Sequence, residues 1–449
     1  MPSTGKNYNP SRSLIYLFII VIIFGTLSLK IPGTTVNPIS TIDALFTATS
    51  AVCVTGLTVK DTGTFFTPIG KVIILLLIQI GALGYMSLAS LIVLLLRRGM
   101  NIKGKLLVKK QMSGTKSIKL HRFILRVVIL TVTLELLGAV VLILRMGNIF
   151  DSFFKTAAFG IFHSVSAFCN AGFDIFGKGV SLTPLSGDPV AVMLISLLII
   201  VGGIGYIVID DVIEYFAARL KKKNHGITVH TKIVLTTTVF LLLFGTIIYY
   251  LAESGNPATM GNMALSQKWL MSFFQAVTPR TAGFSMIDTS GLINFSIIFT
   301  IILMFIGASP GGTGGGIKTT TFAIVVGNIK SIIQDKEDMS VFKRRVAITT
   351  IKNSVAIFSL GIFFIVIVTL FISVFENFSI RKIIFEVTSA FGTVGLSTGI
   401  TDDLKTISKL LIILTMFFGR LGPLTIGSAI LRKTKKVSYR YPEQEVAVG

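Results

Sequence analysis

Eight apolar runs divide this chain, and each is about as long as a helix that crosses a membrane. A hydrocarbon core about 30 Å thick needs about 20 helical residues, and within lipid a backbone must satisfy its own hydrogen bonds. Hydrophobic residues make up 52% of the sequence and charged residues 14%. We therefore predict an all-α membrane protein with eight transmembrane helices. The runs are Leu14–Leu29, Pro68–Leu96, Phe123–Leu144, Pro189–Ala218, Ile233–Leu251, Ile293–Ile333, Ile351–Phe375 and Ile407–Leu431.

The basic residues predict how these helices are oriented. The formal net charge is +22, and 28 of the 42 Lys and Arg residues lie in five segments that alternate with basic-poor ones. Segments rich in Lys and Arg stay on the cytoplasmic side, so both termini and three loops are predicted inside. The charge is explained by topology and leaves no need for a nucleic-acid partner. The five segments are 1–12, 97–126, 219–232, 330–352 and 432–440.

Four related segments recur between successive pairs of apolar runs. They read FTATSAVCVTGL, FHSVSAFCNAGF, FFQAVTPRTAGF and FEVTSAFGTVGL, and each has a glycine ten positions after its first Phe. These glycines, Gly56, Gly172, Gly283 and Gly395, are 116, 111 and 112 residues apart. The chain is therefore predicted to contain four tandem parallel repeats of helix, re-entrant segment and helix. The predicted bounds are 12–98, 122–222, 230–334 and 346–434, followed by a cytoplasmic tail at 435–449.

The length of the related segments predicts that they enter the membrane and return to the same side. Ten helical residues reach about 15 Å, half a hydrocarbon core, and irregular backbone at that depth must be buried in protein or line water. One copy alone would favour an ordinary outer loop, but four copies in one register favour a pseudo-fourfold pore. Such a pore can replace the hydration shell of a cation with backbone carbonyls. Parallel repeats also argue against carriers built on inverted pairs.

With these motifs the sequence resembles the Trk/Ktr/HKT potassium transport proteins along essentially its whole length. In that family each repeat supplies one filter glycine, and some sodium-preferring plant members carry serine in the first repeat. Four glycines therefore imply selectivity for K⁺, bound by backbone carbonyls. The sequence lacks the two additional N-terminal spans of the Trk branch, so the resemblance points to a Ktr-type membrane subunit. The predicted filter residues are Val54, Thr55, Gly56, Asn170, Ala171, Gly172, Thr281, Ala282, Gly283, Thr393, Val394 and Gly395.

The stretch IGASPGGTGGGIKTTT, residues 306–321, interrupts the sixth apolar run. Glycine costs about 1 kcal/mol and proline about 3 kcal/mol inside a helix, so we predict a break near mid-membrane. Nucleotide binding is disfavoured because no strand precedes the loop and cytosolic ATP cannot reach it. A passive kink and a gate remain, and the resemblance implies an intramembrane gating loop at 307–321. The predicted gate residues are Gly311, Gly312, Thr313, Gly314, Gly315, Gly316, Lys318 and Arg420.

Arg420, Glu135 and Arg280 are charged residues inside predicted membrane segments. Arg420 should face the cavity, since a central Arg costs about 2.5 to 3.5 kcal/mol. It either binds loop carbonyls or makes a helix-packing hydrogen bond, or it forms a positive barrier to cations. The resemblance implies an Arg in contact with the gating loop. For Glu135 an interhelical hydrogen bond is expected rather than a role in ion handling. Arg280 is expected to bind neighbouring backbone carbonyls.

Small-residue steps occur in the second helix of each repeat. The helical pattern is expected to continue past Gly81-x-x-Gly84, Gly202-x-x-Gly205 and Gly419-x-x-Gly422, and to break only in repeat three. Asp210, Asp211 and Glu214, beside Arg219 and Lys221, are read as paired or solvated charges.

The predicted function is potassium uptake across a bacterial plasma membrane, with a sodium-coupled potassium symporter as the alternative. An inside-negative potential supplies about 2.3 kcal/mol per 100 mV for each ion. No enzyme site or organic cofactor is expected, since the four histidines lack ligand spacing, and Cys53 and Cys169 are read as free thiols. No inner segment is long enough for a sensor domain. The resemblance implies a homodimer in lipid above a cytosolic RCK/KTN-type ring, KtrA-like, that binds ATP or ADP and contacts the loop Lys330 to Lys352.

Overall fold

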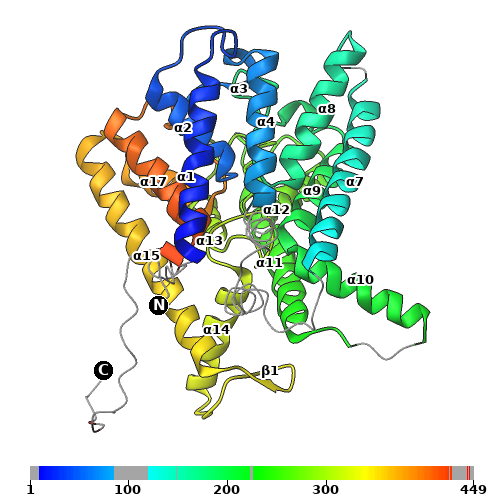
Figure 1. The fold of residues 1–449 in the computed structure, drawn as a ribbon, viewed down its shortest axis with the longest axis vertical. Helices are drawn as coiled ribbons and strands as arrows, with labels where there is room; N and C mark the ends of the chain where they lie inside the picture. The colour runs from blue at the N-terminus through cyan, green and yellow to red at the C-terminus, as the bar shows by residue number, and fades with distance from the viewer. Residues whose placement is uncertain are drawn as a thin grey trace, which may run out of the picture.

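The computed structural model describes residues 10–84, 120–147, 149–222, 226–423, 425–426, 442 and 444. Within them, long helices stand side by side and enclose shorter ones (Figure 1). The end of the predicted second helix of repeat one, most of the basic segment 97–126 and nearly all of the tail 435–449 lie outside the described residues.

One order of helices recurs four times along the described chain: a long helix, a short buried helix, and a further apolar helix. In the first quarter these are α1 (Pro10–Leu29), α2 (Thr41–Val52), the single turn α3 (Thr62–Phe65) and α4 (Pro68–Leu83). The second has α7 (Leu120–Met146), α8 (Phe153–Phe168), the 3₁₀ turn η3 (Thr183–Leu185), α9 (Pro189–Ile204) and α10 (Tyr206–Leu220). The third has α11 (Val229–Glu253), α12 (Leu265–Val277), α13 (Asn294–Phe305) and α14 (Thr319–Ile333), and the fourth α15 (Ile348–Phe375), α16 (Ile380–Gly392) and α17 (Thr406–Leu421).

Strand structure among the described residues departs slightly from the all-α expectation. A small antiparallel hairpin, β1 (Ser340–Val341) with β2 (Arg344–Arg345), lies in the basic segment 330–352. Its turn residues Phe342 and Lys343 both have positive φ, the geometry of a tight hairpin turn. Two-residue strands carry no alternating pattern long enough to be read from sequence.

Several described helices are long and apolar enough to cross a membrane. Four helices are long and apolar enough by themselves, namely α1, α7, α11 and α15. The bent pair α9 and α10 makes a fifth if it is one span. Helices α4, α13 and α14 are apolar but shorter. This is a helical membrane protein; eight crossings remain a prediction.

The expectation of unbroken second helices was wrong in repeats two and four. α9 ends at Ile204 and α10 leaves it at 96°, because Gly205 has a φ of 99°, a conformation that glycine adopts freely. α17 likewise ends at Leu421, before Gly422 with a φ of 83°. The break predicted in repeat three is present, since α13 ends at Phe305 and α14 begins at Thr319.

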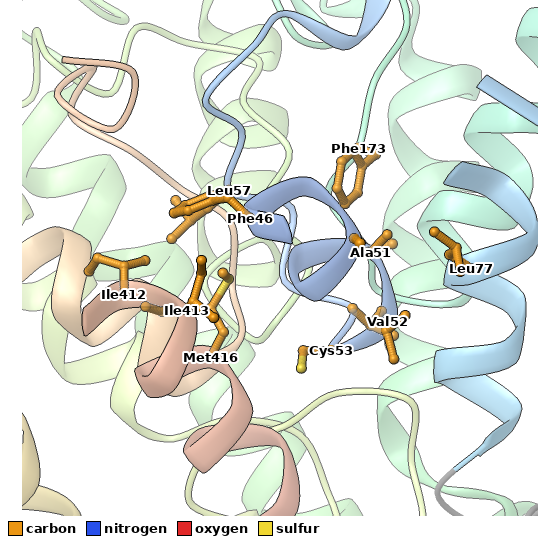
Figure 2. Packing of buried hydrophobic residues seen from close by; sticks show 14 of the residues in the cluster. Phe46, Ala51, Val52, Cys53, Leu57, Leu77, Phe173, Ile412, Ile413 and Met416 are labelled. Carbon is orange, nitrogen blue, oxygen red and sulfur yellow. The ribbon is translucent and has the colours of Figure 1, made fainter. Parts of the chain in front are cut away.

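The short helices form the core, and α2 illustrates how they are held. Its Phe46 and Ala51 are fully buried. Figure 2 shows α2 between Leu77 of α4 on one side and Ile412 and Met416 of α17 on the other. Burying such side chains contributes about 1.5 to 3 kcal/mol each in water, and in lipid close packing itself drives helix association.

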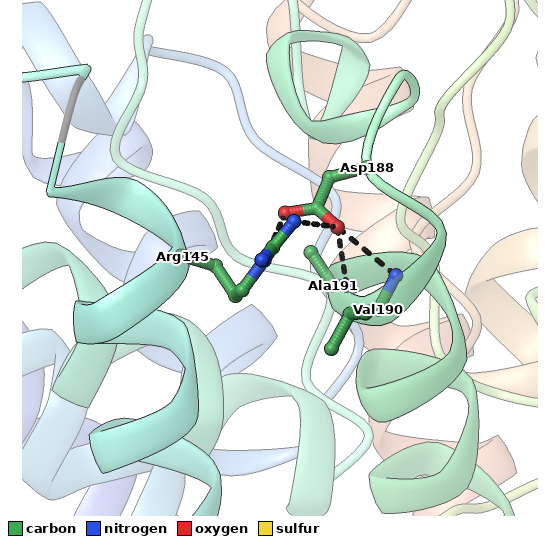
Figure 3. Close-up of polar contacts among 4 residues, drawn as sticks. All are labelled: Arg145, Asp188, Val190 and Ala191. Atoms are coloured by element: carbon green, nitrogen blue, oxygen red, sulfur yellow. Dashed lines mark hydrogen bonds and ion pairs between the residues drawn. The ribbon is translucent and has the colours of Figure 1, made fainter.

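An ion pair fixes the start of α9 against the end of α7 (Figure 3). Arg145 donates to the Asp188 carboxylate from Nε at 2.6 Å and from Nη2 at 3.0 Å. The same carboxylate caps α9 by accepting from the backbone N–H of Val190 at 3.0 Å and of Ala191 at 3.4 Å. Its hydrogen bonds to Arg145 lower the pKa of Asp188.

Replacing Asp188 should separate the stability that comes from the helix cap from the stability that comes from the ion pair with Arg145. We expect Asp188→Ala to lower the free energy of unfolding by about 1 kcal/mol through loss of the cap, and Asp188→Asn, which keeps a capping oxygen, to cost less. A carboxylate with a lowered pKa stabilises the fold above its unfolded pKa of about 3.9, and this contribution is lost as the pH falls through the folded pKa. Thermal unfolding in detergent at pH 7 and pH 3 would measure both effects; equal melting temperatures for the two variants at pH 7 would contradict the capping role.

Candidate functional site

The four predicted filter segments meet at one cavity, although they are more than 100 residues apart in sequence. Gly56, Gly172, Gly283 and Gly395 all line a cavity of about 980 Å³. The structure therefore brings together what the repeat pattern predicted as one site. We call this cavity the vestibule.

The glycines touch in a closed ring that follows chain order. A Cβ added to Gly56, Gly172, Gly283 or Gly395 would lie less than 3.0 Å from a backbone oxygen of the next repeat, and repeat four closes onto repeat one. All four also have positive φ, between 69° and 98°. No other residue type fits there without moving a neighbouring carbonyl. The facing carbonyls belong to Ala171, Ala282, Val394 and Thr55 in that order.

The residue two positions before each glycine is strained in the same way. These residues have positive φ between 49° and 70° although none is glycine. Left-handed backbone costs about 1 to 2 kcal/mol per such residue, and outliers of this kind cluster at functional sites. Four at one offset indicate one shared conformation. They are Val54, Asn170, Thr281 and Thr393.

Hydroxyl groups of the short helices hold the ring in two ways. In repeats one and four, Ser50 and Ser389 each accept a hydrogen bond from the filter glycine N–H, both at 3.1 Å. In repeats two and three, Ser166 and Thr278 donate to the carbonyl after the glycine, at 2.7 and 2.6 Å. The segment that follows each short helix leads directly to the ring, so the helices present their partly negative C-terminal ends to it.

The vestibule has a strong excess of negative charge. Among the described residues that line it are five aspartates and a single lysine, Lys60. Burial, with the charge of Asp61, raises the pKa of Asp174 from 3.8 to about 6. A cleft of one sign concentrates ions of the opposite sign, so the vestibule favours cations. The aspartates are Asp61, Asp174, Asp288, Asp402 and Asp403.

The glycine-rich loop between α13 and α14 contacts three of the four repeats. Gly315 N donates to Thr393 Oγ1 at 2.9 Å, and Thr313 N donates to Gly202 O at 3.1 Å. A Cβ on Gly314 would collide with Thr281. The loop therefore touches the residues that precede the filter glycines in repeats three and four.

Two positively charged side chains donate hydrogen bonds to this loop. Arg420 is 5% exposed and donates to Thr313 O, and to Gly81 O of α4 at 2.7 Å. Lys318 donates from Nζ to Gly314 O at 2.7 Å and Gly315 O at 3.3 Å. These contacts agree with the reading of Arg420 as a partner for loop carbonyls or in helix packing; the barrier reading stays a prediction.

Comparisons with known proteins agree with this arrangement. A family model for TrkH, described as a cation transport protein, matches residues 7–438. The chain belongs to the TrkH family of cation transport proteins. It is therefore a membrane transport protein and not an enzyme, and the resemblance read from the sequence is confirmed.

Individual relatives cover almost the whole chain. Ktr system potassium uptake protein B of Bacillus subtilis is 36% identical over 443 residues, 98% of this chain and 97% of that protein. Potassium/sodium uptake protein NtpJ of Enterococcus hirae is also 36% identical, over 457 residues, 99% of this chain and 98% of that one. The crystal structure of the potassium transporter TrkH from Vibrio parahaemolyticus matches with a TM-score of 0.72 at 17% identity, covering 96% of this chain and 87% of that one.

Other buried polar residues of this TrkH-family chain partly follow the sequence expectations. Glu135 makes the expected interhelical hydrogen bond, since Gln79 Nε2 donates to it at 2.7 Å. Cys53 and Cys169 are free and buried. Arg280 differs: its guanidinium donates to the Thr238 hydroxyl at 3.4 Å, in place of the expected carbonyls.

Glu386 is a residue that sequence reasoning missed. It lies in α16, is 2% exposed, and accepts from Ser397 Oγ at 2.6 Å, Thr398 N at 2.8 Å and Thr401 Oγ1 at 2.9 Å. These three residues line the vestibule. The signal was an acid in the otherwise apolar start of FEVTSAFGTVGL. Across the described residues, no cluster of three or more His, Cys, Asp or Glu side chains is arranged to hold a metal ion.

The raised pKa of Asp174 predicts a pH dependence of transport. Below a pH of about 6 this carboxyl is protonated, so the vestibule loses one negative charge. Uptake at low cation concentration should fall about twofold between pH 7.5 and 5, because unit charges about 10 Å apart in water interact by about 0.4 kcal/mol. Initial uptake rates measured across this range should show the step in the wild type and not in Asp174→Asn. Asp288→Asn is the matched control: it removes a vestibule charge and should keep the step. A step that persists in Asp174→Asn would contradict the assignment.

Proposed function

We propose that this chain carries K⁺ into the cell through one pore at the glycine ring. The observation that carries the proposal is the closed ring of four left-handed glycines beneath an acidic cavity. Its relatives are named for potassium uptake. The inside-negative potential provides about 2.3 kcal/mol per 100 mV for each ion, so uptake needs no further energy source.

The proposed architecture has four parallel repeats around the pore, with eight crossings and both termini in the cytoplasm. The recurrence of long, short and apolar helices supports the repeats. The break between α13 and α14 explains why each of these two helices is shorter than a full span. The basic segments supply the orientation.

In the proposed filter, K⁺ exchanges its water shell for carbonyls of the three residues that end in each glycine. The twelve residues predicted from sequence all belong to segments that reach the ring. Because glycine lets backbones approach so closely, the repeats can form one ion-sized aperture. Positive φ at two of every three positions supports an unusual carbonyl orientation.

The glycine-rich loop is the proposed gate, with residues 311–316 as its moving part. Its contacts with Thr281 and Thr393 place it directly against the ring. Lys318 and Arg420 hold its carbonyls and so favour the position observed. Loops of small residues accommodate the large φ/ψ changes that gating requires.

We further propose a homodimer regulated by a cytosolic nucleotide-binding ring. The word "system" in the names of the Ktr relatives supports a partner. In this chain the hairpin in 330–352 exposes Lys343 and Arg344, which suit an acidic partner, while Arg345 pairs with Asp338 at 2.7 Å. Nucleotide would then bind to the partner, and the resulting movement of the partner would be transmitted to the glycine-rich loop.

A sodium-coupled potassium symporter is the second candidate, because NtpJ is named for both ions. The two functions differ in one measurement. Potassium uptake into proteoliposomes that contain no sodium on either side should proceed for a pore and fail for an obligate symporter.

Substitution of a ring glycine tests the filter. Gly56→Ser places a Cβ against Ala171 O in a left-handed backbone, so the ring should widen or distort. We expect discrimination against Na⁺ to fall about tenfold or more, equivalent to about 1.4 kcal/mol. Competition of Na⁺ with K⁺ uptake would measure it. Gly187→Ala, where nothing lies within 4 Å, is the control, and unchanged selectivity in Gly56→Ser would refute the filter.

Removal of the loop tests the gate. Deleting residues 311–316 takes away the contacts beneath the ring, so basal K⁺ flux of the purified chain should rise about tenfold or more. Flux into proteoliposomes, with size-exclusion chromatography as the folding control, would measure this. A folded variant with abolished flux would make the loop structural.

A further inference from the structure

The second helix of repeat two is broken at the same level as the glycine-rich loop, and the two breaks face each other. α10 turns away from α9 by 96° at Gly205, and Figure 1 shows it running outward at the lower end of α9. A Cβ on Gly205 would lie 2.6 Å from Pro310 O and 3.2 Å from Gly312 N. This break thus depends on close backbone contact with the loop.

Three backbone hydrogen bonds join the break to the loop. A helix end leaves its last carbonyls without partners, and a helix start leaves its first N–H groups without partners. Gly202, Gly203 and Tyr206 are buried, so their free backbone groups need partners within the protein. Here the loop supplies partners to both helix ends: Ser309 N to Gly203 O at 2.9 Å, Thr313 N to Gly202 O at 3.1 Å, and Tyr206 N to Gly311 O at 3.1 Å.

The rest of α10 is tied to neighbouring helices by two adjacent acids. Asp210 pairs with Arg126 of α7 at 2.8 Å. Asp211 accepts from the N–H of Thr228 at 3.0 Å, and Thr228 caps α11. α10 therefore connects the inner ends of α7 and α11 directly to the loop.

We propose that α10 is a second gating element and that the break at Gly205 moves together with the loop. Withdrawal of the loop removes the partners of Gly202, Gly203 and Tyr206, and α9 and α10 regain them by aligning into one helix. A bent α10 therefore favours the loop beneath the ring, and a straight one favours its withdrawal. The proposal rests on the loop being the gate. It makes Gly205 a positioning residue for that gate.

The test measures K⁺ flux into proteoliposomes made with the full purified chain. Gly205→Ala disfavours the left-handed break and should raise flux about tenfold, equivalent to about 1.4 kcal/mol. Gly33→Ala is the matched control, because Gly33 also has a positive φ, of 92°, but nothing lies within 4 Å of its added Cβ. Its flux should equal that of the wild type. Unchanged flux in a folded Gly205→Ala protein would overturn the proposal.

A double variant separates gating from mere structural damage. In a chain lacking 311–316, Gly205→Ala should have no further effect, because it acts through the loop. An equal loss of flux in both backgrounds would overturn the proposal. If deletion alone raises flux and Gly205→Ala does not, only the role of α10 fails; if deletion itself does not raise flux, the proposed gate fails and α10 with it.

A milder variant decides the matter if Gly205→Ala does not fold. Asp210→Asn combined with Glu214→Gln removes both ion pairs of Arg126 with α10, at 2.8 Å and 3.7 Å, without disturbing the break. It should raise flux by up to about fivefold, the limit for a partly exposed pair, and only when the loop is present. No rise, or the same change without the loop, would overturn the proposal.

Discussion

One contact between backbones determines how the whole site is built. In repeats one, two and four, a glycine of the second helix lies against the carbonyl four residues before the filter glycine, so closely that an added Cβ would be less than 3.0 Å from that oxygen. The contact fixes the end of the short helix and hence the direction in which the chain leaves it toward the ring. A methyl group there would collide with that carbonyl, so the short helix or the second helix would have to move. The pairs are Gly81 with Val52, Gly202 with Phe168, and Gly419 with Phe391.

Repeat three departs from this rule, and the departure explains the loop. The equivalent glycine, Gly307, faces Gly315 O of the loop itself. The carbonyl four residues before Gly283 belongs to Pro279, within a series of turns that follows α12. The short helix of repeat three is therefore not held by its own second helix, and the space that this leaves is filled by the loop. The gate that we propose here needs no cavity of its own, since the loop lies where the other repeats have a contact between two helices.

The sequence predicted the ring well because the ring depends on a local motif repeated four times. The spacing from Phe to Gly within each segment does not depend on how the loops fold. Pro310 followed by glycines in the middle of an apolar run predicts a broken helix. The break at Gly205 could not be found in this way, because a single glycine inside an apolar run does not distinguish a packed helix from a broken one. Its conformation is set by Pro310 and Gly311, about 105 residues away. Likewise Asp174 and Asp288 come together only once loops from different repeats are placed.

Arg420 acts on this site through its contacts more than through its charge alone. Its guanidinium reaches Thr313 O in repeat three and Gly81 O in repeat one from a helix of repeat four. Buried charges that lose their partners cost several kcal/mol, so the proposed withdrawal of the loop is opposed by the loss of the bond to Thr313 O. A bare positive charge beneath the filter would repel cations whether the loop were in place or not. Bound to a loop carbonyl, the arginine instead acts by stabilising the observed position of the loop. If the loop is the gate that we propose, these hydrogen bonds stabilise its closed position, and opening is costly until other groups in the cavity replace them.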